Sequence, residues 1–357
     1  MKGLILSGGK GTRLRPLTYT SSKQLIPVAN KPILFYGIEK LIASGVNEIG
    51  IVAGDSIDEI RSTVAAAKWG KARIKFIRQP EPLGIAHAVL CAAKFLGRSP
   101  FILYLGDNLL NHDLKGFIRE FEEKKLDGKI LLTKVEDPRL FGVVEFKKNR
   151  IVRLVEKPKD PPSKWALCGV YIFNGRIHDI IRKLKPSKRG EYEITEAIQG
   201  LLENGYNLGH SFVDGWWKDT GKLEDLLEAN RIILDAENAG DIPRTTKVTA
   251  SRIEGRTKIG KKCVIRNSVL RGPLVIGDDV KINSAYIGPY SAIANGVTLS
   301  HCEVENSIVL EAAEIKDIKK RLTDSLIGKN VSILAVSEKP KNNSFMVGDN
   351  SRIVLGE

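Results

Sequence analysis

Residues 3–14 have the sequence GLILSGGKGTRL, in which a short aliphatic run leads directly into a glycine-rich turn. The run from Gly3 to Ser7 predicts a buried β-strand, because a short apolar run bounded by turn residues is typical of one. Three similar runs predict further strands nearby, at Glu48–Ala53, Arg73–Arg78 and Phe101–Leu105.

Helical patterns lie between these strands. Pro32–Ser44 and Ile85–Leu96 carry apolar residues at helical spacing, and Ser56 with Glu59 matches a capping box that begins a third helix. This alternation, with continuously apolar strands, predicts an α/β fold whose parallel sheet is covered on both faces. Ligands of such sheets bind beyond the carboxyl ends of the strands.

The pattern changes after about residue 130, where β-rich segments precede helical ones. We interpret this part as a continuation of the first domain, in which a second sheet covers the site. The expected strands are 130–136, 141–146, 151–155 and 167–173, and the expected helices are 176–184, 193–204 and 222–236.

From Ile253 onwards, aliphatic residues recur at steps of about six, and several precede a glycine. Such a period, rich in Val, Ile and Asn, is typical of a parallel β-helix of hexapeptide repeats. The alternative is a set of ordinary strands with accidental spacing. We expect one domain over 1–236 and a β-helix over 245–355, with an insert at 316–323 that loops out of the repeat.

Composition and net charge limit the classes of ligand and partner that the chain could bind. The chain has 357 residues, and 56 Lys and Arg against 42 Asp and Glu give a net charge of +14, which suits polyanionic small substrates. No dense basic block interleaved with aromatic residues indicates nucleic-acid binding. No apolar run reaches the roughly 18–20 residues of a membrane helix, and the four cysteines form no CxxC pair. We expect a soluble cytoplasmic protein with neither membrane nor nucleic acid as partner.

The glycine-rich turn is suited to an anion. Glycines such as Gly8 let the backbone N–H groups approach phosphate oxygens. The loop is not a Walker A motif, because Lys10 is followed by glycine, nor a dinucleotide fingerprint, because Leu14 replaces the third glycine. A merely structural turn is the alternative. Arg13 in the loop and Lys23 ten residues later add two cations that bind phosphate well.

At these residues the chain resembles the nucleoside-triphosphate–sugar-1-phosphate nucleotidyltransferases. The signature G-G-x-G-T-R-L is present at 8–14, and the segment that begins K-Q-L follows at 23–27. The resemblance implies a Rossmann-like mixed sheet followed by a left-handed β-helix. The nucleotide-binding residues that it implies are Gly8, Gly9, Gly11, Thr12, Arg13, Lys23, Gln24, Gln79, Gly84 and Asp107.

The segment QPEPLGIAHA at 79–88 resembles the part of the family that binds the base. The resemblance implies that Gln79 and Gly84 face a pyrimidine. A glutamine amide both donates and accepts hydrogen bonds, which fits thymine or uracil. A polar turn between a strand and a helix is the alternative interpretation.

Two acidic motifs complete the phosphate side. Asp107 ends the fourth predicted strand, and Asp219 lies in a W-x-D-T-G motif, which the resemblance implies to be a Mg²⁺-binding pair. Mg²⁺ seldom needs more ligands from the protein than two carboxylates. Either aspartate alone would more simply be a turn or helix-cap residue.

The sugar side rests on the motifs FGVV, EKP and GVY. The resemblance implies that Glu156 binds the sugar hydroxyls and Lys157 the sugar phosphate. It also implies that the backbone at Gly142 lies beside the hexose and that the backbone at Val170 completes the sugar pocket. Without these motifs, Glu156 and Lys157 would be ordinary surface residues. The segment 189–195, RGEYEIT, also resembles the family, but we assign no role to it.

The resemblance implies that a sugar 1-phosphate attacks the α-phosphate of a nucleoside triphosphate. The catalytic residues would be Arg13, Lys23, Asp107, Lys157 and Asp219. A hexapeptide tail is typical of the long members that use dTTP and glucose 1-phosphate, with UTP left open. Two further alternatives are an additional acyl transfer by the β-helix, with His301 as base, and a regulatory subunit without turnover. A homo-oligomer is expected.

Overall fold

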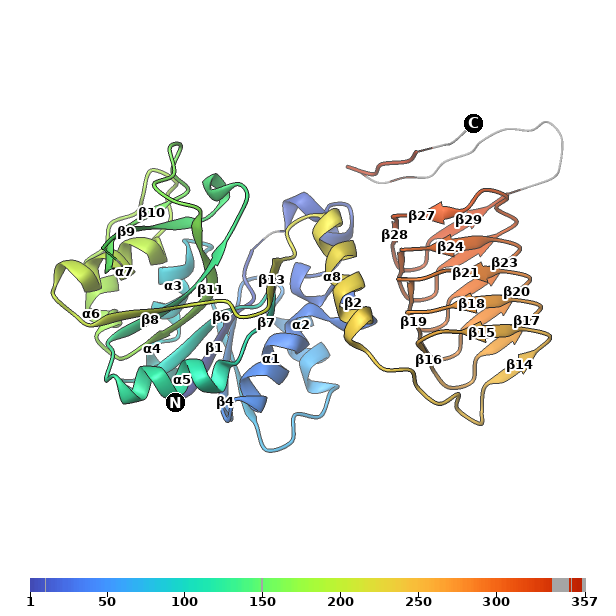
Figure 1. Ribbon diagram of the computed structural model, residues 1–357, viewed down its shortest axis with the longest axis horizontal. Coiled ribbons are helices and arrows are strands. Elements are labelled where there is room, and N and C mark those ends of the chain that lie inside the picture. Colours follow the sequence, from blue (N-terminus) through green and yellow to red (C-terminus); the bar gives the residue numbers. More distant parts are fainter. Residues whose placement is uncertain (10, 149, 336–346, 348, 355–357) are drawn as a thin grey trace. The chain divides into compact units, whose positions relative to one another are not determined.

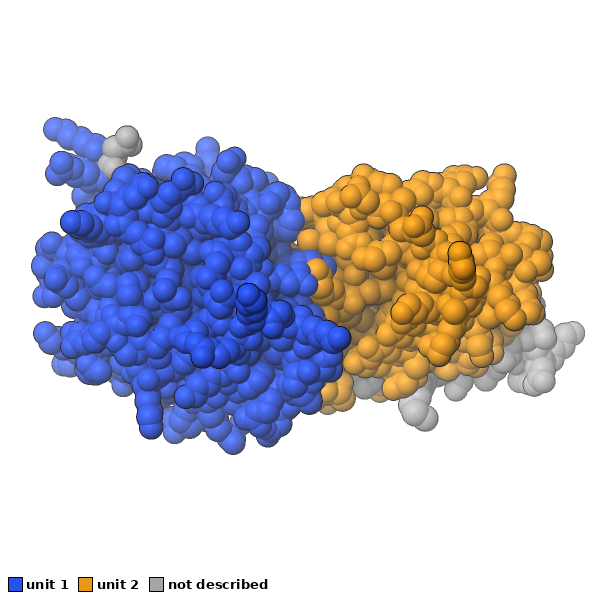
Figure 2. Space-filling view, turned by 90° about the horizontal axis from the view of Figure 1, so that it is seen from below, with its two compact units in different colours: residues 1–10, 22–25, 33–219 blue, residues 11–21, 26–32, 220–357 orange. Residues whose placement is uncertain are grey.

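The computed structural model describes residues 1–9, 11–148, 150–335, 347 and 349–354. Lys10 and part of the expected 245–355 domain therefore lie outside the described residues. The chain divides into two compact units (Figure 2). Unit 1 comprises Met1–Lys10, Ser22–Leu25 and Ile33–Asp219, and unit 2 comprises Gly11–Ser21, Ile26–Pro32 and Thr220–Glu357.

A mixed β-sheet forms the centre of unit 1 (Figure 1). Its strands follow the order β10-β9-β11-β6-β1-β4-β5, and β8 joins β11 to β12. Strands β6, β1, β4 and β5 are parallel, whereas β11 is antiparallel to β6. The bounds are β1 Lys2–Leu6, β4 Glu48–Ala53, β5 Arg73–Arg78, β6 Phe101–Leu105, β8 Gly128–Lys134, β9 Gly142–Lys147, β10 Arg150–Glu156, β11 Trp165–Phe173 and β12 Leu208–Phe212.

Both faces of this sheet are buried, as β6 demonstrates. Phe101 and Leu103 belong to one hydrophobic cluster, and Ile102 and Tyr104 belong to another. Alternate side chains of a strand point to opposite faces, so helices cover the sheet on both sides. One cluster contains residues of α1 Ile33–Ala43, α2 Ile57–Ala65 and α5 Leu114–Glu123; the other contains residues of α3 Ile85–Cys91, α4 Ala93–Leu96, α6 Ile177–Ile181 and α7 Ile194–Glu203. The predicted fold class is confirmed, but the expected second sheet is wrong: β8, β9, β10 and β11 extend the first sheet through the pairing of β11 with β6.

Several local predictions differ from the structure. The capping box is wrong: the Ser56 side chain makes no cap bond, and the Glu59 carboxylate accepts the backbone N–H of Ser22 at 2.9 Å instead. The helix expected over Ile85–Leu96 is interrupted at Ala92. The pattern did not predict α5, or the antiparallel ribbon of β7 Asn108–Asn111 and β13 Trp216–Asp219. No helix in the described parts of the chain has the length and apolar character to cross a membrane.

Unit 2 contains the predicted parallel β-helix (Figure 1). Its three parallel sheets are consistent with the left-handed class. Each coil adds one strand to each of its parallel sheets. The first sheet contains β14 Lys247–Thr249, β17 Val264–Arg266, β20 Lys281–Asn283, β23 Thr298–Ser300, β26 Glu314–Lys316 and β29 Ser332–Leu334. The second contains β15 Arg252–Glu254, β18 Val269–Arg271, β21 Tyr286–Ile287, β24 Glu303–Glu305 and β27 Leu322–Thr323; the third contains β16 Thr257–Ile259, β19 Leu274–Ile276, β22 Ala292–Ile293, β25 Ile308–Val309 and β28 Leu326–Ile327.

The repeat is shorter than three hexapeptides. Ile265 pairs with Ile282, and Ile282 with Leu299, so these coils advance by 17 residues. All three side chains are buried in the core of the β-helix. The expected insert at 316–323 does not loop out: Val304 pairs with Leu322, so the segment lengthens its coil to 18 residues and contributes β27.

Helix α8, Leu223–Ala236, belongs to unit 2 and is fixed by a buried asparagine. The Oδ1 atom of Asn230 accepts the N–H of Ala29 at 2.9 Å, next to the small β2–β3 hairpin of Pro27–Val28 and Lys31–Pro32. Its Nδ2 atom donates to the carbonyl oxygen of Tyr290 at 2.7 Å, in the β-helix. Asn230 thus ties α8 to both elements.

Candidate active site

Lys23 is the centre of a charged cluster in unit 1. It lies in a buried 3-10 turn, Lys23–Leu25. Its Nζ atom is 2.6 Å from Oδ2 of Asp107 and 3.7 Å from Oδ1 of Asp219. The lysine side chain is 8% exposed, whereas the carboxylates are 26% and 29% exposed. A buried ammonium group therefore joins two carboxylates that remain accessible to a ligand.

The two aspartates meet because of the β7–β13 ribbon. Asp107 directly precedes β7, and Asp219 ends β13 opposite Asn108 in the antiparallel register. The buried Asn108 side chain donates to the carbonyl oxygen of Cys168 at 3.0 Å, and the indole N–H of Trp217 donates to the same oxygen at 2.8 Å. These bonds anchor the ribbon to β11 and hold both carboxylates at one edge of the sheet.

This pair fits a divalent metal ion. Carboxylate oxygens are the ligands that Mg²⁺ prefers, and Mg²⁺ usually takes only one or two of them while keeping water or substrate phosphates. Lys23 neutralises part of the local negative charge, which lowers the repulsion between the carboxylates. Among the described residues no cluster of three or more His, Cys, Asp or Glu side chains forms an all-protein metal site. A metal ion held by this pair would take its remaining ligands from water or from phosphate oxygens.

A cavity of about 150 Å³ adjoins the cluster. Asp107 and Asp219 line it together with Gly142, Glu156 and Lys157. Gly142 pairs with Glu156 in the β9–β10 register, and a Cβ atom at position 142 would lie only 2.5 Å from Cγ2 of Thr195. The metal-binding candidates therefore share one cavity in unit 1 with Gly142, Glu156 and Lys157, and the close packing of β9 against Thr195 requires glycine at 142.

The segment at Val170 behaves differently. The Val170 side chain is buried in the hydrophobic core, and its neighbours Gly169 and Tyr171 line the cavity. Gly169 has a φ of +73°, and a Cβ atom there would lie 2.2 Å from Nδ2 of Asn108. The close approach of β11 to the β7–β13 ribbon thus requires glycine.

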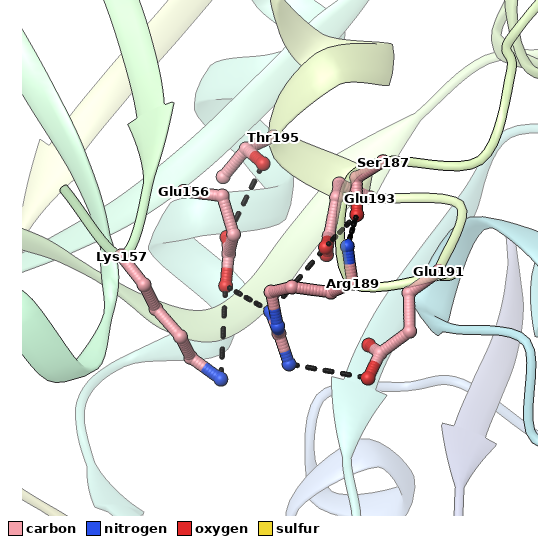
Figure 3. A network of polar contacts seen from close by, with 7 residues as sticks. All are labelled: Glu156, Lys157, Ser187, Arg189, Glu191, Glu193 and Thr195. Atoms are coloured by element: carbon pink, nitrogen blue, oxygen red, sulfur yellow. Dashed lines mark hydrogen bonds and ion pairs between the residues drawn. The ribbon is translucent and has the colours of Figure 1, made fainter.

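Glu156 is the centre of a polar network (Figure 3). Its Oε1 atom is 3.4 Å from Nη1 of Arg189 and 3.9 Å from Nζ of Lys157. Its Oε2 atom accepts a hydrogen bond from Thr195 Oγ1 at 3.2 Å. Burial, and to a lesser degree the charge of Glu193, raises the pKa of the Glu156 carboxyl. The cavity therefore contains a desolvated carboxylate that can accept hydrogen bonds from a ligand.

Arg189 connects this network to the neighbouring loop. Besides Glu156 it pairs with Glu191 at 3.1 Å and with Glu193 at 3.3 Å (Figure 3). Glu193 is held in turn by the hydroxyl of Ser187 at 2.9 Å. Sequence reasoning gave Arg189 no role. The only signal was the segment 189–195 itself, which resembles the family without revealing its contacts.

The candidates for base binding also meet within unit 1. The Gln79 side chain is buried, and its Nε2 atom donates to the carbonyl oxygen of Gly84 at 3.2 Å. The side-chain amide of Gln24 donates to the carbonyl oxygen of Gly8 at 3.3 Å. Gly84 has a φ of +100°, and a Cβ atom there would lie 2.7 Å from the carbonyl oxygen of Tyr192. Only glycine allows this contact between the two loops.

The glycine-rich loop is divided between the units. Gly8 and Gly9 belong to unit 1, whereas Gly11, Thr12 and Arg13 belong to unit 2. Gly11 is in the left-handed conformation, and its carbonyl oxygen accepts a hydrogen bond from Thr18 Oγ1 at 2.8 Å. The Arg13 guanidinium lies against Gly221, where a Cβ atom would be 2.9 Å from Nη2. Glycine after the W-x-D-T motif thus leaves room for the arginine.

His301, the candidate for a second activity, lies on an exposed turn of the β-helix. Its φ is +47°, and its Nδ1 atom is 3.0 Å from Oδ1 of Asp317. Ser284 and Asn267, one and two coils earlier, have a similar positive φ of +49° and +48°. The turn conformation thus recurs in coils without histidine.

The comparisons with known proteins agree with this geometry. A family model described as nucleotidyl transferase matches residues 2–236. A glucose-1-phosphate thymidylyltransferase of Streptomyces griseus is 42% identical over 355 residues, 99% of either chain. A low-salt glycan biosynthesis nucleotidyltransferase of Haloferax volcanii is 41% identical over 99% of this chain and 100% of its own.

Two solved structures each resemble about two thirds of the chain. A crystal structure of the Bacillus anthracis protein assigned as a glucose-1-phosphate thymidylyltransferase, in complex with sucrose, has a TM-score of 0.63 and 33% identity over 68% of this chain and 98% of its own. A UDP-glucose pyrophosphorylase in complex with UDP-glucose has a TM-score of 0.61 and 26% identity over 66% of this chain and 99% of its own. Fold, cavity and full-length likeness lead to one conclusion: the chain belongs to the nucleotidyl transferase family of enzymes.

Proposed function

We propose that this chain is a glucose-1-phosphate thymidylyltransferase, which converts dTTP and glucose 1-phosphate into dTDP-glucose and pyrophosphate. The observation that carries the proposal is the convergence of Lys23, Asp107 and Asp219 beside a cavity lined by Glu156 and Lys157. The likeness over the whole chain to the Streptomyces enzymes supports this choice of substrates.

The reaction makes one bond and breaks one. A phosphate oxygen of glucose 1-phosphate attacks the α-phosphorus of dTTP, the bond between that phosphorus and the α–β bridging oxygen breaks, and pyrophosphate leaves with the electron pair. The attacking oxygen is already negatively charged, so no general base is needed. Catalysis then rests on positioning the phosphates and neutralising their charge.

The proposal gives each basic side chain of the site a role in binding or neutralising phosphate. Lys157, which is about half exposed, binds the phosphate of the sugar, while Glu156 accepts hydrogen bonds from the sugar hydroxyls. Lys23 neutralises charge at the α-phosphate, and Arg13 stabilises the leaving pyrophosphate. The backbone N–H groups of the glycine-rich loop bind the remaining phosphate oxygens.

Asp107 and Asp219 are the residues that would hold Mg²⁺. When bound, Mg²⁺ supplies positive charge to the phosphates as a Lewis acid. Lys23 keeps the two carboxylates close together through its salt bridges of 2.6 and 3.7 Å before substrate arrives. Removing its charge would therefore affect both metal affinity and turnover.

UTP is a second candidate for the nucleotide. Uracil presents the same imide edge as thymine, and one of the similar solved structures contains UDP-glucose. The missing methyl group is worth only about 1–3 kcal/mol in a hydrophobic pocket.

The test is Mg²⁺-dependent pyrophosphate release, with dTTP or UTP against the 1-phosphates of glucose, galactose and N-acetylglucosamine. We expect the highest kcat/KM for dTTP with glucose 1-phosphate. A preference for UTP would keep the chemistry and change the substrate, and folded protein without release from any pair would refute the enzyme assignment.

A further inference from the structure

The amide of Gln79 has only one orientation that satisfies its neighbours. Its Nε2 atom lies 3.2 Å from the carbonyl oxygen of Gly84, which can only accept a hydrogen bond. The NH₂ end must therefore face Gly84. Its second N–H lies toward Nδ1 of His87, at an Nε2–Nδ1 distance of 3.2 Å.

This contact determines the state of the His87 ring. Since Gln79 donates to Nδ1, that nitrogen must be unprotonated, and the proton of the neutral ring is on Nε2. Nε2 lies 3.7 Å from Sγ of Cys91, one helical turn further along α3, and sulfur is a weak acceptor. Both ring nitrogens thus have a partner that fits this tautomer.

The ring itself is held in place by the neighbouring loop. His87 stacks on Tyr192 with a centroid distance of 6.3 Å and an interplanar angle of 28°. The backbone of Tyr192 forms two hydrogen bonds with the segment that contains His87. Its N–H donates to the carbonyl oxygen of Leu83 at 2.8 Å, and its carbonyl oxygen accepts from the N–H of Ala86 at 3.1 Å. The stacking and these hydrogen bonds together fix the orientation of the His87 ring between α3 and the 187–192 loop.

Only the oxygen of the Gln79 amide is then left for a ligand. Both amide hydrogens point to Gly84 and His87, while Oε1 faces the glycine-rich loop, 3.1 Å from the place of a Cβ atom on Gly8. An oxygen can accept from the N3–H of thymine or uracil. It cannot satisfy the N3 of cytosine, which is itself an acceptor.

We propose that His87 is a specificity-determining positioning residue, which fixes the Gln79 amide so that the site selects bases carrying an imide N–H. The inference rests on the proposed function, because it requires a pyrimidine nucleotide to bind beside Gln79. Without the acceptor at Nδ1, the carbonyl oxygen of Gly84 alone would oppose rotation of the amide, so the orientation that offers its NH₂ group to cytosine would become less costly. His87 itself need not touch the nucleotide.

The test compares the full-length wild type with His87→Phe and His87→Asn. Phenylalanine keeps the stacking on Tyr192 but removes the acceptor, whereas asparagine can place an oxygen close to the position of Nδ1. Calorimetric Kd values are measured for dTTP, dUTP and dCTP. We expect the preference for dTTP over dCTP to fall roughly tenfold in His87→Phe and to recover in His87→Asn.

The dTTP to dUTP ratio is the internal control, because both bases carry the imide and differ only by a methyl group. It should stay constant in all three proteins. A folded His87→Phe variant with an unchanged dTTP to dCTP ratio, or with all three nucleotides weakened equally, would overturn the proposal. His87→Leu serves as a second variant without the acceptor if phenylalanine is not accommodated.

Binding, and not turnover, is measured so that the two claims can fail separately. A wild type that prefers dTTP over dCTP in binding but releases no pyrophosphate would refute the proposed function alone. A wild type that makes dTDP-glucose, with a dTTP to dCTP ratio that does not respond to His87, would refute the role of His87 alone.

Discussion

The sheet of unit 1 and the β-helix of unit 2 bury aliphatic strands in different ways. In the β-helix, Ile265 lies beside Ile282, the equivalent residue of the next coil and only 17 positions away. In the sheet, Leu4 lies between Gly50 and Leu103, which come from distant parts of the chain. A local repeat is therefore enough to specify the β-helix, whereas the sheet depends on long-range pairing.

Their charges differ as well. The ion pairs of Arg321 with Glu303 and Glu305 lie on the surface of the β-helix, where such pairs contribute little to stability. Unit 1 instead holds the largely buried Lys23 and the desolvated Glu156 beside its cavity. The comparison shows that stacked aliphatic side chains form the core of the β-helix in unit 2. Unit 1 instead buries charged side chains beside its cavity, where their desolvation lowers stability.

Lys23→Met should have the largest effect, on activity. Methionine keeps much of the length of the side chain but removes the charge that neutralises the reacting phosphates. We expect kcat to fall by roughly 10²–10³-fold at saturating substrates, measured as pyrophosphate release. Lys94→Met, at an exposed position on α4, is the matched control and should keep wild-type turnover.

The same variant also reports on the metal site without catalysis. Removing the ammonium group leaves Asp107 and Asp219 with one counter-charge fewer, so they repel each other more strongly. Mg²⁺ should then raise the Tm of Lys23→Met by more than it raises that of the wild type. Equal shifts in both proteins would contradict the assignment of these carboxylates as metal ligands.

Ile282→Ala tests the stacking of the β-helix. The side chain is buried between the same positions of the adjacent coils. Its truncation should lower the free energy of unfolding of the β-helix by about 2–5 kcal/mol, measured by urea denaturation followed by circular dichroism. Lys281→Ala, one residue earlier and exposed, should change it by less than about 0.5 kcal/mol.

Glu156→Gln should change stability less than Ile282→Ala does, and it should raise the stability where Ile282→Ala lowers it. Because burial raises the pKa of Glu156, its stabilising contribution is complete below the ordinary carboxyl pKa of about 4.3 and is lost as the pH rises through the raised value. The ionised group therefore costs stability at pH 7. The glutamine variant should have a slightly higher Tm at pH 7, and the difference should disappear below about pH 4.

The gain in stability should be accompanied by a loss of function. The KM for glucose 1-phosphate should rise roughly tenfold, because an amide accepts hydrogen bonds less strongly than a carboxylate. Glu122→Gln, at an exposed position on α5, should leave both Tm and KM unchanged. A Glu156→Gln variant that is less stable than the wild type at pH 7 would show that the ion pair with Arg189 outweighs desolvation.

The sequence was most informative where local pattern and fold agree. The runs at Glu48–Ala53 and Phe101–Leu105 coincide with β4 and β6, because these strands are buried on both faces, and the alternating run at Arg73–Arg78 coincides with the edge strand β5. The capping box failed because Glu59 has a stronger tertiary role, in which it fixes the backbone of Ser22 beside Lys23. No local pattern distinguishes these two uses of a glutamate.

The site was predictable as a set of residues but not as an arrangement. Motifs pointed to Asp107 and Asp219, yet their meeting depends on the pairing of Asn108 with Asp219, more than a hundred positions away. Likewise, no pattern shows that Arg189 reaches Glu156, or that His87 contacts Gln79. Side-chain geometry of this kind arises only when the long-range pairing of the sheet is complete.

The most direct test of the central claim follows oxygen atoms through the reaction. Glucose 1-phosphate labelled with ¹⁸O at its three non-bridging phosphate oxygens is incubated with dTTP, Mg²⁺ and the full-length protein, and the products are analysed by mass spectrometry. We predict dTDP-glucose that retains all three labelled oxygens, one of them in the bridge between its phosphates, and unlabelled pyrophosphate. Absence of dTDP-glucose, or label in the pyrophosphate, would contradict the proposed attack on the α-phosphorus.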